Sequence, residues 1–385
     1  MLSNEIKDFK NLKVALIHYW LVTWRGGEKV IKAILELFPN VDIYTLFLDN
    51  GLKENFLPHY KIYTSILNKI SFFKKHHQKV FPLYPFGIAS LKLKDNYDLI
   101  ISSESGPAKG IKKPEKIPHI CYVHTPMRYC WGFTDEYLRA LPPPVRPIAN
   151  FFFILLKEWD KKTIDNVDLY VANSINVQQR IKRFYNRDAI VVYPPIDKDI
   201  FKDTGLKPKG MKCDYYLSFG ALVPYKKIDL LVKVFNRRKD KLIIIGDGSE
   251  KKRLESMANQ NIEFKGYVPD NELKKYIVNA KSLLFPGEED FGMIPLEVMA
   301  RGVPVIAYGK GGALETVLEN DNPETSTGLF FYEQSEDAIE DAIKEFEKNE
   351  TYYDPFFLRN HALKFNEDNF KLNFLQVVNQ ILKIY

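Results

Sequence analysis

Cysteine and long apolar runs are scarce in this chain of 385 residues. Three cysteines, an odd number without the spacing of metal ligands, predict neither a disulfide framework nor a zinc site. The longest apolar run, residues 148–156, contains an asparagine and has about half the length needed to span a bilayer. The N-terminal residues 1–13 are charged and lack the apolar segment of a signal peptide. We therefore expect a reduced, cytoplasmic protein.

Acidic residues are absent from one long stretch, residues 55–94. The net charge is +6, but residues 1–189 carry +10 and the remainder −4. A solvated basic face explains such a stretch, and so does a surface that rests on anionic lipid. Nucleic acid is a weaker explanation, because no recognisable nucleic-acid motif accompanies the charge, and we expect no nucleic-acid partner. The stretch contains seven lysines interleaved with apolar residues: Lys61, Lys69, Lys74, Lys75, Lys79, Lys92 and Lys94.

Short apolar segments alternate with helical patterns in both halves of the chain, which predicts mostly parallel sheets covered by helices. In the second half, helix 228–235 follows strand 215–219. The chain length fits two domains. The expected strands are 13–18, 97–102, 119–123 and 168–172 in the first half, and 215–219, 242–245, 262–264, 282–285 and 304–307 in the second.

The two α/β domains are predicted to join near Pro194 and Pro195, which stiffen the chain and exclude helix. We expect an N-terminal domain of residues 1–195 and a C-terminal domain of residues 196–365. Residues 366–385 form an amphipathic pattern that predicts a final helix, packed back on the N-terminal domain. Ligands of such sheets collect at the carboxyl ends of the strands, so two facing domains would enclose one cleft.

One stretch, residues 285–302 (FPGEEDFGMIPLEVMARG), combines two glutamates with a glycine and a proline. Gly292 and Pro295 place Glu289 on a loop after a strand, with a helix that begins near residue 294. Glu297 then lies in the first helical turn, and Gly302 ends the helix. The amides of residues 292–294 would form an anion site. A carboxylate beside an anion site suits a ligand with both a diphosphate and a neutral diol, such as a nucleotide sugar.

The sequence resembles retaining glycosyltransferases of family 4 (group 1), which have the GT-B fold of two facing Rossmann-like domains with a central cleft. The resemblance covers nearly the whole chain and rests on an ordered set of motifs. Within the family, HYWLVTWRGGEKV, YVHTPMRYCWGFTDEYL and LVPYKKIDLLV are most similar to mannosyltransferases that use GDP-mannose. The remaining motifs are IGDGSEKKRLE, IEFKGYVPDNEL, EDFGMIPLE and MARGVPVIAYGKGGALETV.

The resemblance implies roles for individual residues. Glu289 would hold hydroxyls of the donor sugar near the reacting carbon, Glu297 would hold the ribose diol, and Lys226 would neutralise the leaving diphosphate. The amides of Gly26 and Gly27, which we expect in a loop after strand 13–18, would approach that diphosphate, which requires bare backbone. The further residues expected at the donor are His124, beside the sugar; Arg128, facing phosphate or acceptor; Tyr267 and Val268, at the base; and Gly248, Phe291, Gly292, Met293, Ile294 and Lys227.

One departure from the family pattern concerns the loop GALVPYKK. Many relatives have an arginine where this chain has Ala221, so either some stabilisation of the diphosphate is missing, or Arg25, Lys227 or Arg128 supplies it. No Asp-x-Asp pattern stands where a metal-dependent transferase needs one. We therefore predict that no metal or other cofactor is required, and that Glu289, Lys226 and His124 are the catalytic residues.

The expected function is transfer of a hexose, mannose from GDP-mannose, to a lipid-linked saccharide or polysaccharide, with retention at the anomeric carbon. The enzyme would lie at the inner face of the cytoplasmic membrane. A UDP-sugar donor is an alternative, because recognition of a base by backbone leaves little trace in sequence. Nucleotide-sugar epimerases and phosphorylases share the architecture, although no cofactor lysine of a phosphorylase can be identified. An inactive donor-binding protein is a further alternative, motivated by Ala221.

Overall fold

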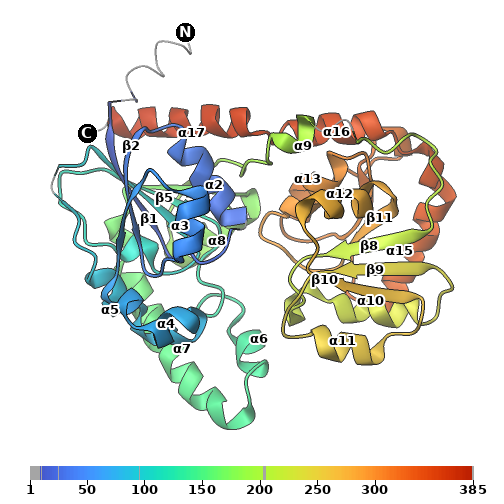
Figure 1. Cartoon of the computed structure of the whole chain (residues 1–385), viewed down its shortest axis with the longest axis horizontal. Coiled ribbons are helices and arrows are strands. Elements are labelled where there is room, and N and C mark those ends of the chain that lie inside the picture. The colour runs from blue at the N-terminus through green and yellow to red at the C-terminus, as the bar shows by residue number, and fades with distance from the viewer. Residues whose placement is uncertain (1–8, 10, 25, 95, 203–204, 384–385) are drawn as a thin grey trace. The chain divides into compact units, whose positions relative to one another are not determined.

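The computed structural model describes residues 9, 11–24, 26–94, 96–202 and 205–383. The chain divides into two compact units. Unit 1 contains Met1–Pro195 and Asp368–Tyr385, and unit 2 contains Ile196–Glu367. Within the described residues, each unit is built on one parallel sheet, of seven strands in unit 1 and six in unit 2 (Figure 1). The expected α/β class is confirmed.

The sheet of unit 1 has the strand order β3-β2-β1-β4-β5-β6-β7. All its printed strand pairs are parallel. The strands are β1 (Lys13–His18), β2 (Asn40–Thr45), β3 (Lys61–Thr64), β4 (Leu99–Glu104), β5 (His119–Val123), β6 (Leu169–Ala172) and β7 (Ala189–Val191).

Alternate residues of these strands face opposite layers of helix, because side chains of a strand point to the two faces in turn. Val14 and Leu16 of β1 belong to the core that α2 (Gly26–Leu35), α3 (Asn50–Phe56) and α17 (Glu367–Leu382) complete. Ala15 and Ile17 belong to the opposite core. That side is covered by η1 (Ile66–Lys69), α4 (Ser71–Lys75), η2 (His77–Leu83) and α5 (Tyr84–Ala89), and farther along the sheet by α7 (Arg146–Lys162) and α8 (Ile175–Tyr185). Helix α6 (Thr134–Arg139) packs against α7 and has no buried residue.

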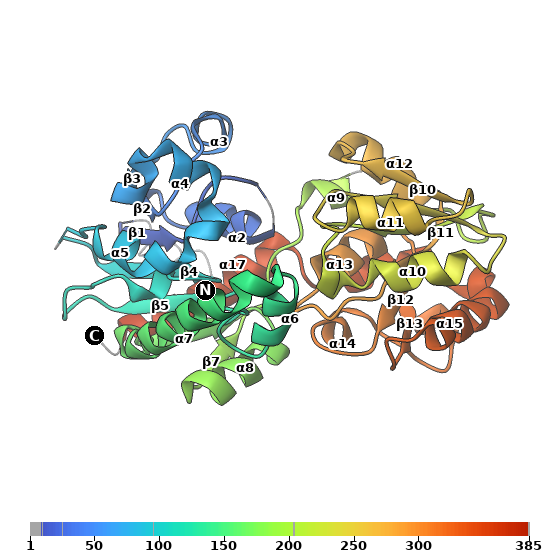
Figure 2. The same cartoon turned by 90° about the horizontal axis from the view of Figure 1, so that it is seen from below.

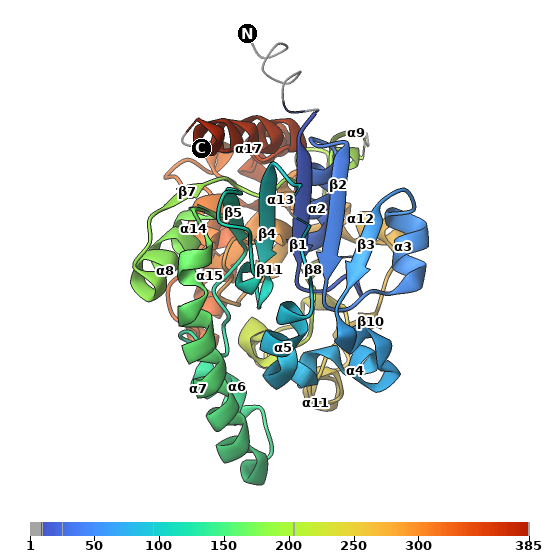
Figure 3. The same ribbon diagram turned by 90° about the vertical axis from the view of Figure 1, so that its left-hand side faces the viewer.

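The final helix, α17, packs on unit 1, although the chain reaches it only after completing unit 2 (Figure 3). Phe370 and Phe374 stack on each other at 5.7 Å between ring centroids, and both lie against Tyr122 of β5. Lys371 pairs with Glu36 at 2.5 Å. The helix begins directly after Asn366. Burial of two phenylalanines provides several kcal/mol, about 3 or more, for holding the C-terminus in place.

Unit 2 repeats the scheme with the order β10-β9-β8-β11-β12-β13, again with parallel pairs. Its strands are β8 (Tyr215–Phe219), β9 (Lys241–Ile245), β10 (Ile262–Gly266), β11 (Ala280–Phe285), β12 (Val305–Tyr308) and β13 (Gly328–Phe331). Its helices are α9 (Asp199–Lys202), α10 (Ile228–Phe235), α11 (Lys251–Met257), α12 (Asp270–Val278), α13 (Met293–Met299), α14 (Ala313–Thr316), α15 (Glu336–Asn349) and α16 (Pro355–Leu363).

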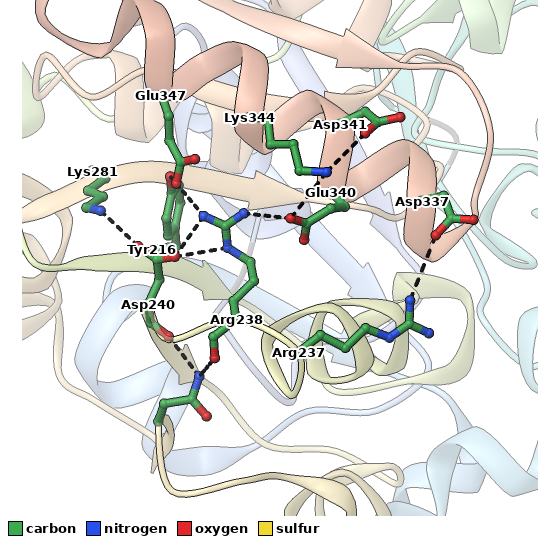
Figure 4. Close-up of polar contacts among 11 residues, drawn as sticks. Tyr216, Arg237, Arg238, Asp240, Lys281, Asp337, Glu340, Asp341, Lys344 and Glu347 are labelled. Carbon is green, nitrogen blue, oxygen red and sulfur yellow. Dashed lines mark hydrogen bonds and ion pairs between the residues drawn. The ribbon is translucent and has the colours of Figure 1, made fainter.

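A charged network ties α15 to the sheet of unit 2 (Figure 4). Arg238 donates to Asp240 at 2.7 Å, to Glu340 at 3.0 Å and to Glu347. Burial alone would raise the pKa of Asp240, but a hydrogen bond from Lys281 and the charge of Arg238 bring that pKa below its usual range. The network therefore holds α15 against the sheet of unit 2.

Several predicted strands agree with the structure, including 13–18, 119–123 and 215–219. Strand 97–102 begins two residues later than predicted, at Leu99. Gly26 and Gly27 were expected in a loop, which is wrong: both lie in the first turn of α2. Gly302 has the expected positive φ of 76°, but α13 ends at Met299, before a turn that leads to that glycine. The interior strand β2 and the edge strands β3, β7 and β13 were not predicted.

Candidate active site

The strand order places a topological switch point in each sheet. In unit 1, the connections from β1 lead to β2 and β3 on one side, whereas β4 lies on the other. In unit 2, β9 and β10 lie on one side of β8, and β11 lies on the other. Loops diverge at the carboxyl ends of such strands and leave room for a ligand. The predicted site residues that we describe below follow β1 and β5 in unit 1, and β8, β9, β10 and β11 in unit 2.

At the switch point of unit 2, Lys226 and Glu289 form an ion pair. Lys226 ends the short turn Pro224–Lys226 after β8, and Glu289 lies on the loop after β11. Their side chains are 15% and 18% exposed, so the pair is shielded but reachable by a ligand. The sequence separates these residues by more than sixty positions, and the fold brings them into contact as the family motif implies.

The residue after Lys226 has a strained backbone. Lys227 adopts a left-handed φ of 54° at the start of α10, a conformation that costs a residue with a Cβ about 1 kcal/mol or more. No side-chain cap satisfies the first amides of α10. At Lys227 the chain leaves the turn that carries Lys226 and enters α10.

The loop that carries Glu289 is held by a second loop. The amide of Gly312 donates to the Glu289 carbonyl at 2.8 Å. Gly292 precedes α13 with φ 89°, a conformation that glycine adopts without strain. Its position leaves the first amides of α13, beginning with Met293 and Ile294, without a side-chain cap. Glu297 is half-buried in the same helix.

The remaining predicted donor residues of unit 2 differ in exposure. An added Cβ at Gly248 would lie 2.2 Å from the carbonyl oxygen of Leu222, so the loops after β8 and β9 touch through bare backbone. Tyr267 is 82% exposed, whereas Val268 is buried. Phe291 is buried and its ring lies 5.8 Å from that of Phe365. Phe291 therefore supports the loop, while Tyr267 is available to a ligand.

At the switch point of unit 1, three side chains from three elements form a chain of hydrogen bonds. The Ser103 hydroxyl lies 3.0 Å from His18 Nδ1 and 2.8 Å from His124 Nε2. His18 and Ser103 are register partners at the ends of β1 and β4, and His124 directly follows β5. His18 and Ser103 are fully buried, and His124 is half-buried. Sequence analysis predicted His124 but missed its two partners.

A buried carboxylate lies on the far side of His18. Glu28 Oε1 is 3.7 Å from His18 Nε2, and the Glu28 side chain is only 3% exposed. The Ser103 hydroxyl has one proton, so it can donate to one of the two imidazole nitrogens while it accepts from the other. Ser103 thereby connects His124 to a buried histidine and orients the His124 ring.

The first turn of α2 lies beside His124. A Cβ added at Gly27 would be 3.7 Å from His124 Nε2, and Gly26 begins the helix. Amides at the start of a helix have no intrahelical partner and attract anions. Arg25 lies outside the described residues. Arg128 is half-buried, with its guanidinium 5.2 Å from the Phe133 ring, so part of its charge is directed to an aromatic face.

A fully buried charged cluster lies behind this switch point. Lys109 and Asp160 form an ion pair with neither side chain exposed, and Trp131 donates to Asp160 at 2.7 Å. Glu104 ends β4 and accepts from the Lys109 amide at 2.8 Å. Burial raises the pKa of Glu104 to about 8, so the neutral acid dominates at neutral pH. The cluster fixes the end of β4, which carries Ser103.

Within the described residues, no group of three or more His, Cys, Asp or Glu side chains is arranged to hold a metal ion. Over the same residues, no helix is both long enough and apolar enough to cross a bilayer.

Two family models match the chain. Residues 199–364 match the glycosyl transferases group 1 model, and residues 29–200 match the glycosyltransferase family 4 model. The chain belongs to the family 4 (group 1) glycosyltransferases. The family 4 model thus covers most of the sheet of unit 1, and the group 1 model covers Lys226, Glu289 and α13.

Relatives of this glycosyltransferase include mannosyltransferases. It is 24% identical to alpha-1,3/1,6-mannosyltransferase ALG2 of Saccharomyces cerevisiae, over 54% of this chain and 52% of that protein. It is 27% identical to the O-antigen chain mannosyltransferase RfbU of Salmonella typhimurium, over 66% and 70%. It is 29% identical to a GDP-mannose-dependent phosphatidylinositol monomannoside mannosyltransferase of Mycobacterium tuberculosis, over 47% and 53%. The chain therefore spans about half the length of the first and third relatives.

Solved structures share the fold at low identity. The sucrose-phosphate synthase of Thermosynechococcus elongatus aligns with a TM-score of 0.75 and 18% identity, over 97% of this chain and all of that chain (100%). HepE of Anabaena in complex with UDP aligns with a TM-score of 0.69 and 16% identity, over 96% and 100%. These likenesses confirm the GT-B class.

Proposed function

We propose that the protein transfers a hexose from a nucleotide sugar to a saccharide acceptor, with retention at the anomeric carbon. The observation that carries this proposal is the contact of Lys226 with Glu289 at the switch point of unit 2. In a member of this family, the lysine is placed to receive a leaving diphosphate and the glutamate to hold the sugar. The donor is mannose carried by GDP, and the acceptor is a lipid-linked saccharide or polysaccharide.

The chemistry requires no protein base. The bond between the anomeric carbon and the diphosphate oxygen breaks, and the acceptor oxygen bonds to that carbon on the same face. The acceptor's proton passes to the leaving diphosphate oxygen. Lys226 stabilises the negative charge that develops there, together with the uncapped amides at Met293 and Ile294. Lys227 and Arg128 are the described candidates for the charge that Ala221 does not provide.

The other residues bind and orient the donor. Glu297 accepts from the ribose hydroxyls, and the backbone at Tyr267 and Val268 contacts the base beside the loop of Gly248. In unit 1, His124 contacts the donor sugar, and the amides of Gly26 and Gly27 attract the diphosphate. Lysine and amides take the place of a metal ion in this scheme, so transfer is expected without a cofactor.

Mannose and GDP are supported by the relatives, three of which are mannosyltransferases, one of them GDP-mannose-dependent. A UDP-sugar is the second candidate, because HepE, which shares the fold, binds UDP. Backbone contacts to the base distinguish the two only weakly. The acceptor proposal rests on the same relatives, and it places the enzyme at the inner face of the cytoplasmic membrane.

Nucleotide binding provides the first test. We expect the thermal midpoint to rise with GDP and GDP-mannose but not with UDP, ADP or their sugars, equally with and without EDTA, because ligands of the native state raise its stability. A rise with UDP alone would transfer the proposal to a UDP-sugar donor. A rise abolished by EDTA would contradict metal independence, and no response to any nucleotide would overturn the function.

Turnover provides the second test, with Glu289→Gln as the decisive variant. It removes the charge from the carboxylate but keeps its size, so GDP binding should persist while transfer falls about a hundredfold or more. Glu288→Gln is the matched control, because Glu288 pairs with Lys310 at 3.2 Å and has no proposed role. Equal loss in both variants would contradict the assignment. Nucleotide release by the wild type without acceptor would favour an epimerase.

A further inference from the structure

Helix α7 is apolar on both sides, although only one side is covered. Successive residues of a helix are about 100° apart, which places Ala149, Phe153 and Leu156 on one face. These three are buried in unit 1. The opposite face carries Ile148, Phe151, Ile154 and Leu155, which are 61%, 57%, 53% and 49% exposed. A helix of this kind normally lies inside a protein or against an apolar phase.

The exposed apolar residues continue onto the neighbouring elements. Phe81 of η2 contacts Phe153 of α7 at 5.0 Å between ring centroids, so the two elements lie side by side. The helices α4 and α5 pack against η2, and η1 packs against α4. In the view from below, α4, α5 and α7 all lie on the viewer's side of unit 1 (Figure 2). The exposed apolar side chains of the segment 66–86 are Ile66, Ile70, Phe72, Leu83 and Phe86. Exposed apolar side chains that gather on neighbouring elements are rare in a protein without a binding partner at that surface.

Positive charge borders this surface. Residues 55–94 contain no acidic residue. Lys69, Lys75 and Lys79 are exposed, Lys74 is half-buried, and none of them forms an ion pair among the described residues. Glu158, toward the C-terminal end of α7, pairs with Lys161 at 2.7 Å. The basic border disfavours a second copy of the chain as occupant, because two identical surfaces would repel each other.

We propose that α7 and the segment 66–86 form one membrane-docking surface, in which the outer side chains of α7 enter an anionic bilayer and the lysines contact its headgroups. Apolar side chains beside unpaired lysines have the composition of interfacial membrane contacts. The sequence prediction involved the lysines of residues 55–94 and the apolar residues interleaved with them, and α7 is the part that the structure adds. This proposal rests on the lipid-linked acceptor of the proposed function, because such an acceptor lies in a membrane. It does not depend on the identity of the donor.

Vesicle flotation tests the two components separately. We expect the wild type to float with phosphatidylcholine vesicles that contain phosphatidylglycerol, and much less with phosphatidylcholine alone. Phe151→Gln/Leu155→Gln should lower partitioning about a hundredfold at any salt concentration. Lys74→Gln/Lys75→Gln should lower it about thirtyfold at low salt, and less at high salt. Exposed side chains tolerate such changes, so both variants should remain folded.

Matched controls in unit 2 are Phe356→Gln/Leu363→Gln, on α16, and Lys239→Gln/Lys252→Gln. All four residues are exposed, and their substitution should leave flotation unchanged. Equal flotation of wild type and α7 variant, or no flotation of the wild type, would overturn the proposal. So would a wild-type dimer that the α7 variant dissociates without any vesicle binding. The GDP thermal shift of each variant shows independently whether the donor site is intact.

Discussion

The two switch points occupy the same place in two similar sheets but contain different chemistry. In unit 2, Lys226 and Glu289 are charged, partly exposed and carried on loops. In unit 1, His18 and Ser103 are buried and lie within strands, and they hold His124 through neutral hydrogen bonds. The charged pair of unit 2 lies where a ligand can reach it. A side chain that must keep one orientation is held by a buried network.

The two units also differ in the charged residues that support their sheets. The buried pair of Lys109 and Asp160, with neutral Glu104, supports the end of β4 in unit 1. The network around Arg238 in unit 2 fixes α15 to the sheet and lies on β8, β9 and β11 (Figure 4). The stability of unit 1 therefore depends more strongly on buried charges than the stability of unit 2. We expect the largest losses of stability from substitutions in that buried cluster.

Lys109→Met should cause the largest change, because it leaves the Asp160 carboxylate buried without its cation. We expect a loss of about 3–5 kcal/mol in the free energy of unfolding of unit 1. All four tryptophans (Trp20, Trp24, Trp131 and Trp159) lie in unit 1, so denaturant titration followed by their fluorescence reports on this unit.

The control is Lys113→Met, in a more exposed pair with Asp168, for which a loss of about 1 kcal/mol or less is expected. The double variant Lys109→Met/Asp160→Asn should recover part of the loss, because it removes the unpaired charge. Equal losses for Lys109→Met and Lys113→Met would show that burial does not distinguish the two pairs.

Lys226→Ala should have the next largest effect, now on catalysis. Removal of one preorganised charge at a leaving group costs about 3 kcal/mol, which corresponds to about a hundredfold or more in kcat. Steady-state transfer assays measure this loss. Lys310→Ala is the control, because Lys310 pairs with Glu288 and has no proposed role. A drop confined to donor KM would contradict a role in stabilising the leaving group.

Glu104 predicts a pH dependence of stability. Its pKa is raised to about 8 in the folded protein, above the ordinary value of a glutamate. The folded state therefore binds more protons than the unfolded state between these values, and its stability falls as pH rises through this window. From pH 6 to about pH 7.5 the contribution amounts to about 2 kcal/mol. Glu104→Gln should remove this part of the slope. A wild-type and variant difference that is constant with pH would contradict the assignment.

Ser103→Ala should have the smallest effect, about tenfold in kcat, because it releases the orientation of His124 without removing a group that touches substrate. The GDP thermal shift should be unchanged. A positioning role predicts that Ser103→Thr, which keeps the hydroxyl, restores much of the activity. It also predicts that the loss falls on kcat rather than on the KM for the donor. Equal losses in Ser103→Ala and Ser103→Thr would indicate only a packing role.

Local patterns in the sequence predicted much of the fold. Apolar runs such as Val14–Ile17 and Leu242–Ile245 are long enough and rich enough in β-branched residues to indicate buried strands. Edge strands such as β3 were missed because Lys61–Thr64 is only half-buried and lacks a continuous apolar run. The predicted loop at Gly26 was wrong, since two glycines indicate a loop by propensity, whereas the packing of Val30, Ile31 and Ile34 stabilises the helix.

The chain sequence by itself determined the two-sheet class, because that class depends on periodicity within short segments. The motifs that resemble the family also lie within short segments, and they identified the candidate residues of unit 2 and His124. Only the tertiary structure decided that Ser103 joins His18 to His124, and that α7 exposes a second apolar face. The register between β1 and β4 brings Ser103 beside His18. The exposed apolar face of α7 arises because this helix packs on unit 1 through one side only. Both depend on contacts between segments far apart in the chain, which local pattern does not specify.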